Sequence, residues 1–284
     1  MAEMLKDTLK TIEKYKTTSP HYTELLDILE EILILREEFR RRMTEDVFTV
    51  DERLIASKME GGLPLVDLGA GDADLTEPKR YFLALLAIAE KRAPEDAAAI
   101  IAALQDGTLD YEGMVLDAFA EEEAEERSEE AAGEGGGEDD DSFDIIELFL
   151  EESLRPALER VVQKYGDGVA RSGWDEGYCP ICGREPKIGQ IRDEEGRRYL
   201  FCSQCGYEWS FRRIKCPFCG NEEQQSLAYF TIEDEERYRV DVCNVCKRYL
   251  KIVDFRQTQE TANLDVEDIA TLHLDMLAAE EGYD

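Results

Sequence analysis

The sequence has no long hydrophobic run and almost no histidine. No apolar stretch approaches the ~18 residues that a membrane-spanning helix needs, and residues 1–10 lack the uninterrupted apolar segment of a secretory signal. We therefore expect a soluble, cytoplasmic protein that is not embedded in a membrane. Only two histidines occur, His21 and His273, so histidine-based catalysis has little to draw on. We expect His21 to be a surface residue in the first turn of a helix rather than a ligand.

Positive charge is also scarce. The chain has 33 Lys and Arg against 66 Asp and Glu, a net charge of -33. Residues 174–251 are nearly neutral, with 13 basic and 14 acidic side chains, so the rest of the chain carries 20 (33 less 13) against 52 (66 less 14). A surface this acidic repels nucleic-acid phosphate. A salt-loving host and an ordinary solvated surface both account for the acidic excess.

All eight cysteines lie in one stretch of the chain, where they form four Cys-x-x-Cys pairs. Two sulfurs three residues apart on a tight turn can face one ion together, so two such turns supply the four ligands of a tetrahedral centre. The sequence therefore predicts two metal centres. The expected ligands are Cys179, Cys182, Cys202, Cys205, Cys216, Cys219, Cys243 and Cys246.

The segments between the pairs indicate which pairs share an ion. Residues 186–201 read as a strand, a polar turn and a strand, and such a hairpin returns Cys202 to the side of Cys182. Residues 226–242 repeat this arrangement between the third and fourth pairs. We therefore expect the first two pairs to hold one ion and the last two to hold the other, although crossed pairing stays open.

Three of the four pairs are followed by glycine, and the fourth by Lys247. Glycine adopts positive φ at little cost, which lets backbone amides point at the thiolates, so the fourth turn is expected to be less ideal. The alternatives to metal are disulfides or eight unrelated thiols. Disulfides are typical of small secreted chains, and the spacing favours metal.

The metal is iron or zinc, because four thiolates suit both ions. Zinc would be structural only, whereas iron can change oxidation state and make the centres redox-responsive. A centre closed by four thiolates has no open coordination position, which argues against hydrolytic chemistry. No nucleophile with a nearby base and no carboxylate pair stands out by spacing. We therefore expect a binding protein and not an enzyme.

Helical periodicity dominates the first 120 residues. The expected helices are residues 4–17, 21–43, 78–92, 94–104 and 111–120. Ser19 is expected to cap the second helix, with Pro20 in its first turn. Residues 145–165 read as a further helix that Pro156 would kink or restart. Residues 266–280 read as a closing helix that packs on the metal-binding part or on the first helices.

Between these helices lies an acidic insert. Residues 121–141 hold 12 acidic residues, one basic residue and four glycines, which cannot form a core, so we expect disorder or loose helix. A partner-binding tail is the alternative. The expected fold class is α+β, in five parts. They are a helical domain (1–120), an acidic insert (121–142), a joining helix (143–173), a module of two four-cysteine metal sites with short β-hairpins (174–256) and a C-terminal helix (257–284).

Several stretches of the second half carry a resemblance to a known family. They are residues 202–209 (CSQCGYEW), 213–219 (RIKCPFC), 243–251 (CNVCKRYLK), 268–275 (DIATLHLD) and 282–283 (GY). Together they resemble the formate dehydrogenase formation proteins, the FdhE family, over about a third of the chain. Residues 149–156 (FLEESLRP) and 62–65 (GLPL) are weaker matches in the helical half. The acidic insert and Lys247 depart from the family's pattern.

The resemblance implies a cytoplasmic accessory protein for the maturation of respiratory formate dehydrogenase, which binds the catalytic subunit before membrane targeting. It also implies that the same eight cysteines form rubredoxin-like turns that hold metal, which is iron in at least some members. We hypothesise that two bound ions fold the module and position Trp209, Phe211 and Arg213 against this client. Core packing is the alternative for the two aromatic residues, and a homodimer is compatible with the sequence.

Two other functions stay open. A zinc-ribbon nucleic-acid-binding protein would need a basic face, and the charge distribution counts against it. A rubredoxin-like electron carrier would need a reversible metal potential and would leave the helical half without a purpose.

Overall fold

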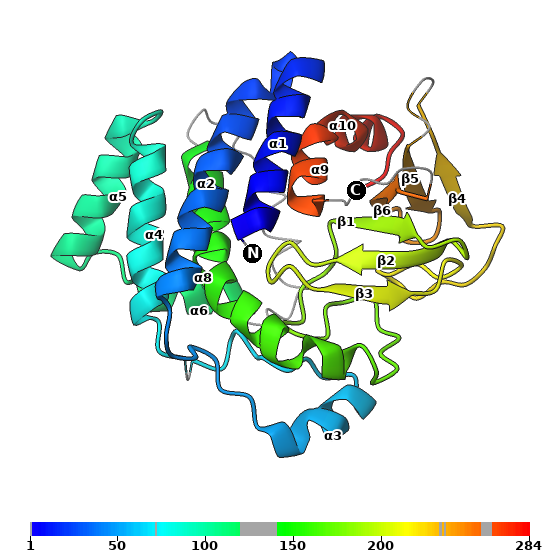
Figure 1. Ribbon diagram of the computed structural model, residues 1–284, viewed down its shortest axis with the longest axis horizontal. Coiled ribbons are helices and arrows are strands. Elements are labelled where there is room, and N and C mark those ends of the chain that lie inside the picture. The colour runs from blue at the N-terminus through cyan, green and yellow to red at the C-terminus, as the bar shows by residue number, and fades with distance from the viewer. Residues whose placement is uncertain (1, 72, 120–140, 233–234, 236, 257–262) are drawn as a thin grey trace, which may run out of the picture.

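Most helices lie on one side of the molecule and the strands on the other (Figure 1). The structure, a computed structural model, describes residues 2–71, 73–119, 141–232, 235, 237–256 and 263–284. The helices are α1 (Ala2–Thr18), η1 (Pro20–Tyr22), α2 (Thr23–Arg42), η2 (Glu52–Leu54), α3 (Ile55–Glu60), α4 (Thr76–Ala89), α5 (Pro94–Asp106), α6 (Tyr111–Phe119), α8 (Asp141–Val169), α9 (Leu264–Ala270) and α10 (Leu272–Glu280). The strands are β1 (Ile188–Arg192), β2 (Arg197–Phe201), β3 (Glu208–Phe211), β4 (Leu227–Phe230), β5 (Tyr238–Cys243) and β6 (Tyr249–Asp254).

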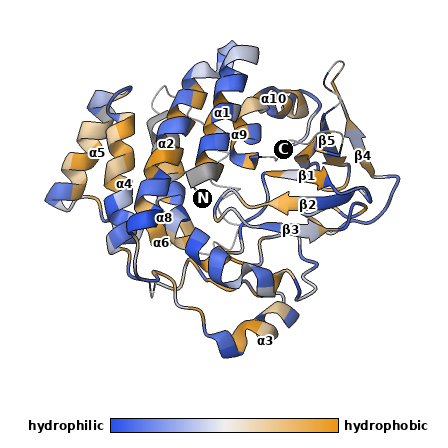
Figure 2. Ribbon diagram, viewed as in Figure 1, coloured by the Kyte–Doolittle hydropathy of each residue, from blue (hydrophilic) through white to orange (hydrophobic). Residues whose placement is uncertain are grey.

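The helical half packs around α8. Phe82 and Leu85 of α4 and Leu154 and Leu158 of α8 are fully buried, at the three- or four-residue spacing that places side chains on one helix face. The helix α2 contacts both α4 and α8. Figure 2 shows hydrophobic residues gathered on α4 and α5, whereas α1 is largely hydrophilic. The expected α+β fold is confirmed.

Both expected hairpins are present, and they belong to a single sheet. The order of the six strands is β3-β2-β1-β6-β5-β4. In the first hairpin β1 pairs with β2, and in the second β4 pairs with β5. The strand β6 joins them, because it pairs antiparallel with β5 and parallel with β1. The sequence analysis anticipated neither the parallel pairing of β6 with β1 nor the edge strand β3.

Several helix boundaries differ from the expected ones. Ser19 precedes a short 3-10 helix and its side chain makes no capping hydrogen bond, so α2 begins only at Thr23. Pro156 lies inside α8 without interrupting it. The closing helix is split at Thr271 into α9 and α10. As expected, it packs on both halves: α9 contacts α1, α2 and β1, and α10 contacts β6.

The helix α8 is more than a connection between two parts. One buried cluster includes Phe82 of α4, Leu154 of α8, Cys202 of the second Cys-x-x-Cys pair and Ile252 of β6, so the core continues from the helices into the sheet. The expected acidic insert lies almost entirely in residues 120–140, outside the described residues, and the five-part division stays a prediction. In the part of the chain that the structure describes, no helix is long and apolar enough to cross a membrane.

Candidate metal centres

Each Cys-x-x-Cys pair forms the same backbone turn. In the first pair, the Cys179 N–H donates to the Arg184 carbonyl at 2.9 Å, and the Gly183 N–H donates to the Cys179 carbonyl at 2.8 Å. Equivalent bonds, four and five residues apart, recur in the turns that begin at Cys202, Cys216 and Cys243. The chain therefore contains four copies of one local structure, which we call the cysteine turns.

The residue after each second cysteine has positive φ. The angle is 80° at Gly183, 73° at Gly206 and 70° at Gly220. Lys247 takes the same conformation in the fourth turn, with φ of 63°. A residue with a side chain at such an angle destabilises the fold by roughly 1–2 kcal/mol. The fourth turn therefore has the same geometry as the other three but is less stable, because they have glycine at this position.

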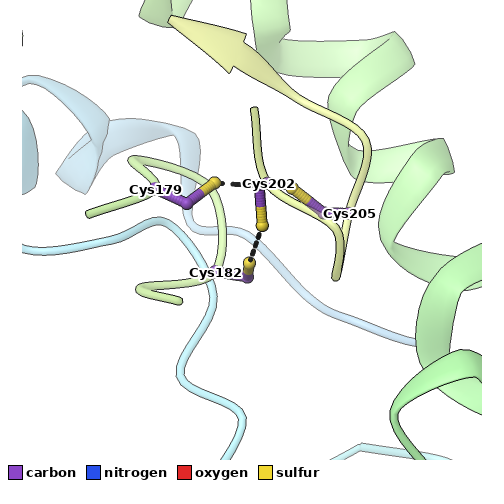
Figure 3. Close-up of side chains that lie close together, drawn as sticks. All are labelled: Cys179, Cys182, Cys202 and Cys205. Carbon is purple, nitrogen blue, oxygen red and sulfur yellow. Dashed lines mark hydrogen bonds between the residues drawn. The ribbon is translucent and has the colours of Figure 1, made fainter. Parts of the chain in front are cut away.

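The turns group sequentially into two clusters. One contains Cys179, Cys182, Cys202 and Cys205, and the other contains Cys216, Cys219, Cys243 and Cys246, and within each cluster the four sulfurs lie within 4.8 Å of one another. Figure 3 shows the sulfurs of the first cluster pointing toward a common centre. The structure thus brings together the cysteines as sequential pairing predicts, not in the crossed arrangement.

The sulfur separations suit a tetrahedral metal. In the first cluster the Cys179 and Cys205 Sγ atoms are 3.4 Å apart, and the second contains two separations of 3.7 Å, one of them between Cys219 and Cys243. A metal–sulfur bond of ≈ 2.3 Å places the corners of a tetrahedron about 3.8 Å apart, whereas disulfide sulfurs lie at about 2.05 Å. All eight cysteines are free. Each cluster could therefore hold one metal ion, and disulfides are excluded in this structure.

The two clusters differ in exposure. All four cysteines of the first are buried, whereas in the second Cys219 is exposed and Cys246 is half-buried. The first cluster also belongs to the main hydrophobic core, which includes Cys179 and Cys205 but none of the second cluster's cysteines. The first cluster therefore has a structural environment, and the second has access to solvent.

Burial works against ionisation of these thiols. It raises the pKa of Cys179 and Cys205 well above the usual thiol value. It opposes ionisation of Cys202 as well, but hydrogen bonds from the neighbouring thiols hold the pKa of Cys202 well below its usual range. In the second cluster, backbone N–H groups and the Asn221 amide outweigh burial and lower the pKa of Cys243 to about 7. A bound cation would stabilise the deprotonated form of all four cysteines in a cluster, because the thiolate is the form that binds metal.

The helical half encloses the first cluster. The Arg155 guanidinium of α8 donates to the Ser203 carbonyl, and the Gln204 amide donates to the Glu151 carbonyl at 2.7 Å. On the other side, the Leu65 N–H donates to the Pro180 carbonyl at 3.0 Å. The sequence analysis missed these contacts. Their signal was the apolar Leu65 in a Gly- and Pro-containing loop and the two weaker family matches in the helical half.

The proposed client-binding residues separate into two groups. Trp209 and Phe211 are buried in the main core, so core packing is correct for them and the client-contact hypothesis is wrong. The Trp209 indole N–H donates to the Glu176 carbonyl at 3.2 Å. Arg213 is exposed, so it alone of the three remains available to a partner. His21 is exposed, as expected.

The cysteine-turn glycines provide a matched pair of substitutions. A Cβ at Gly206 would lie 2.6 Å from the Arg155 guanidinium, whereas a Cβ at Gly220 would meet nothing within 4 Å. Gly220→Ala should therefore cost only the positive-φ penalty, about 1–2 kcal/mol. Gly206→Ala should cost about 1–3 kcal/mol more, because Arg155 is buried and must shift. Thermal unfolding of both variants checks the difference. Equal losses of stability would mean that Arg155 of α8 does not restrict the space at Gly206.

Two family models match the second half of the chain, with one four-cysteine cluster in each. "FdhE, central domain" matches residues 178–213 and "FdhE, C-terminal domain" matches residues 214–284. A protein FdhE homolog of Aquifex aeolicus is 28% identical over 278 residues, which span 97% of this chain and 90% of that protein. The chain is therefore similar to FdhE proteins over almost its whole length. This likeness extends through the helical half, beyond the residues that the two family models match.

Other FdhE proteins are similar over shorter lengths. The FdhE homolog of Pseudomonas aeruginosa is 35% identical over 48% of this chain and 46% of its own length. For an Escherichia coli FdhE the identity is 35% over 42% of this chain and 38% of that protein, so these alignments span less than half of either relative. The crystal structure of the P. aeruginosa FdhE protein shares the fold, with a TM-score of 0.70 and 24% identity over 100% of this chain and 94% of that one.

Proposed function

We propose that this protein is a member of the FdhE family and acts as a cytoplasmic accessory factor for respiratory formate dehydrogenase, which binds the catalytic subunit before membrane targeting. It acts by binding and not by catalysis. The observation that carries the proposal is the family likeness over 97% of the chain, combined with four-cysteine clusters that leave no ligand position open for a substrate. The helical half then has a purpose, because it frames the module that meets the client.

The two clusters are proposed to bind one metal ion each through all eight cysteines. Binding of structural zinc to a peptide of this type stabilises its folded form by roughly 10 kcal/mol at neutral pH. The ions would therefore fold the client-binding module. The second cluster, with its exposed Cys219, is the candidate for a redox response, because solvent reaches it.

Elemental analysis and a visible spectrum test the metal proposal. Protein purified without oxygen should contain two ions per chain. Thiolate-to-iron absorption would identify iron and allow a redox response, whereas two colourless zinc ions would make the centres structural only. Protein that folds without any metal would contradict the proposal that ions fold the module.

A co-purification experiment tests the client. The tagged catalytic subunit of formate dehydrogenase, expressed without its membrane-anchoring partner, should retain this protein. The Cys205→Ser variant, which lacks one ligand of the first cluster, should not be retained. Failure of the intact, metal-loaded chain to bind the subunit would contradict the proposal, whatever the metal.

A further inference from the structure

A pocket of about 360 Å³ lies beside the second cluster. Its floor is one face of the β4–β5 pair, where Leu227 is opposite Cys243 and Tyr229 is opposite Asp241. Directly paired residues share a face of the sheet. The other wall is the segment 213–218, which includes the third cysteine turn. The strand β4 is the last strand of the sheet and lies at the outer edge of the molecule in Figure 1, so the pocket sits at an accessible border.

Basic side chains dominate the charged lining of this pocket. Asp241 is the one acidic residue among the described residues that line it. The basic ones are Arg198, Arg213, Lys215, Arg239 and Arg248. Such a concentration is unexpected by chance in a chain with a net charge of -33. The thiolates of the second cluster offset part of it, because Cys216 and Cys243 line the same space.

Two of these cations are already engaged outside the pocket. The Arg248 guanidinium donates twice to the Glu185 carboxylate, at 2.9 and 2.7 Å. The Lys215 ammonium donates to the Asp175 carbonyl at 2.8 Å. These contacts hold the Arg248 and Lys215 side chains in place and satisfy their charges. Neither side chain therefore indicates a bound ligand by itself.

The other three cations are incompletely satisfied. Arg198, only 3% exposed, donates to the Arg212 and Lys215 carbonyls and shares the Asp241 carboxylate with Arg239. The Arg198 Nε has no hydrogen-bond partner, and the Arg239 Nε, although 2.8 Å from Asp241, does not point at it in hydrogen-bonding geometry. Within the described residues the exposed Arg213 guanidinium has neither a hydrogen bond nor an ion pair. An exposed arginine without a partner, beside further arginines, favours an anionic occupant.

The rest of the lining is apolar and partly exposed. Ile214 is 51% exposed and Tyr229 is 63% exposed, and the Phe218 ring stacks under the Arg248 guanidinium at 3.8 Å. Exposed aromatic and arginine side chains around an apolar pocket are typical of protein–protein contacts. A small inorganic anion would leave these surfaces uncovered, whereas a peptide with alternating apolar and acidic residues would satisfy both.

We infer that this pocket binds an acidic, extended peptide segment of a partner protein, with a carboxylate against Arg213 and Arg198. The inference rests on the proposed function for the existence of a polypeptide client and adds the chemistry of the segment that is recognised. The free edge of β4 lets such a segment enter and leave the pocket along its length. The second cluster then fixes the 213–218 wall against the sheet, because its cysteines come from both.

Fluorescence anisotropy on the full-length, metal-loaded protein tests this inference. The probe is a labelled six-residue peptide that alternates valine and glutamate, and its control alternates valine and glutamine. We expect the acidic peptide to bind at least ~10-fold more tightly. Arg213→Gln should weaken its binding by about tenfold, the 1.4 kcal/mol of one charge-assisted bond. Arg212→Gln is the matched control, because Arg212 is also exposed but pairs with Asp175 and Glu222 outside the pocket.

Three results would overturn the inference. They are equal binding of the two peptides, equal loss in the two arginine variants, and displacement by free glutarate at the peptide's own affinity, which would assign the site to a small acid. Metal content and circular dichroism must match the wild type in both variants. Peptide binding without capture of the catalytic subunit would contradict the proposed function alone, and capture that Arg213→Gln leaves unchanged would contradict the inference alone.

Discussion

Cys205→Ser is expected to unfold the metal-binding module, whereas Cys219→Ser should leave it folded. Cys205 is 0% exposed and lies in the main core with the rest of its cluster. Loss of this ligand removes most of the binding energy of an ion, which is roughly 10 kcal/mol for structural zinc. That exceeds or equals the whole stability of many domains, about 5–15 kcal/mol. Cys219 is exposed, so water can replace its sulfur as a ligand.

Metal content and thermal unfolding of the two variants check this difference. Cys205→Ser should retain at most one ion and lose the cooperative unfolding transition of the sheet. Cys219→Ser should keep the first ion and unfold with a lowered Tm but an intact transition. If both variants lost the same amount of metal and the same Tm, the buried and exposed clusters would not differ in role. The proposal that the first cluster is structural would then be wrong.

The two four-cysteine clusters were predictable from the sequence because each depends on residues that lie close together in the chain. The spacing within each cysteine pair fixes a turn of a few residues, and the segments 186–201 and 226–242 each fold on themselves into a hairpin. Even the outlier Lys247 obeys the turn, with positive φ. Local pattern was therefore sufficient to group all eight sulfurs correctly.

The remaining features depend on contacts between distant segments, which periodicity does not encode. The parallel pairing of β1 with β6 joins residues about sixty positions apart. No turn sequence between them predicts this pairing. Trp209 and Phe211 read equally well as exposed or buried until β3 is known to pair with β2. Arg155 is only 3% exposed, and nothing in the helical pattern marks it as buried.

Arg155 belongs to a buried ionic network that joins three helices to the first cluster. Arg36 of α2 binds the Glu152 carboxylate of α8 through two bonds of 2.7 Å. Arg36 and Arg155 both donate to the Asp265 carboxylate of α9, at 3.1 and 3.2 Å. Arg155 also reaches the Ser203 carbonyl in the second cysteine turn. The network therefore connects the helical half with the metal ligands.

The charge of Asp265 depends on these guanidinium groups. Burial alone would raise the pKa of Asp265, but the facing Arg155 and Arg36 outweigh it and hold that pKa below the usual value. A carboxyl whose pKa is lowered by folding contributes stability above its unfolded pKa of about 3.9, and this contribution is lost as the pH falls through the folded pKa. At neutral pH the full contribution is present, so removal of a partner cation has its largest effect there.

Arg155→Met is accordingly expected to destabilise the protein by about 3 kcal/mol, the lower end of the cost of breaking a buried ion pair, because Arg36 still faces Asp265. Arg160→Met is the matched control on the same helix, because Arg160 makes a partly exposed pair with Asp46 and a hydrogen bond to the Met43 carbonyl, both at 2.9 Å, and should cost about 1–2 kcal/mol. Denaturant unfolding at pH 7 measures both. Adding Asp265→Leu to Arg155→Met should recover part of the loss, since Arg36 would otherwise be left as the cation that pairs with both the Glu152 and Asp265 carboxylates. A loss from Arg155→Met no larger than that from Arg160→Met would mean that the helices and the first cluster are held together by apolar packing alone.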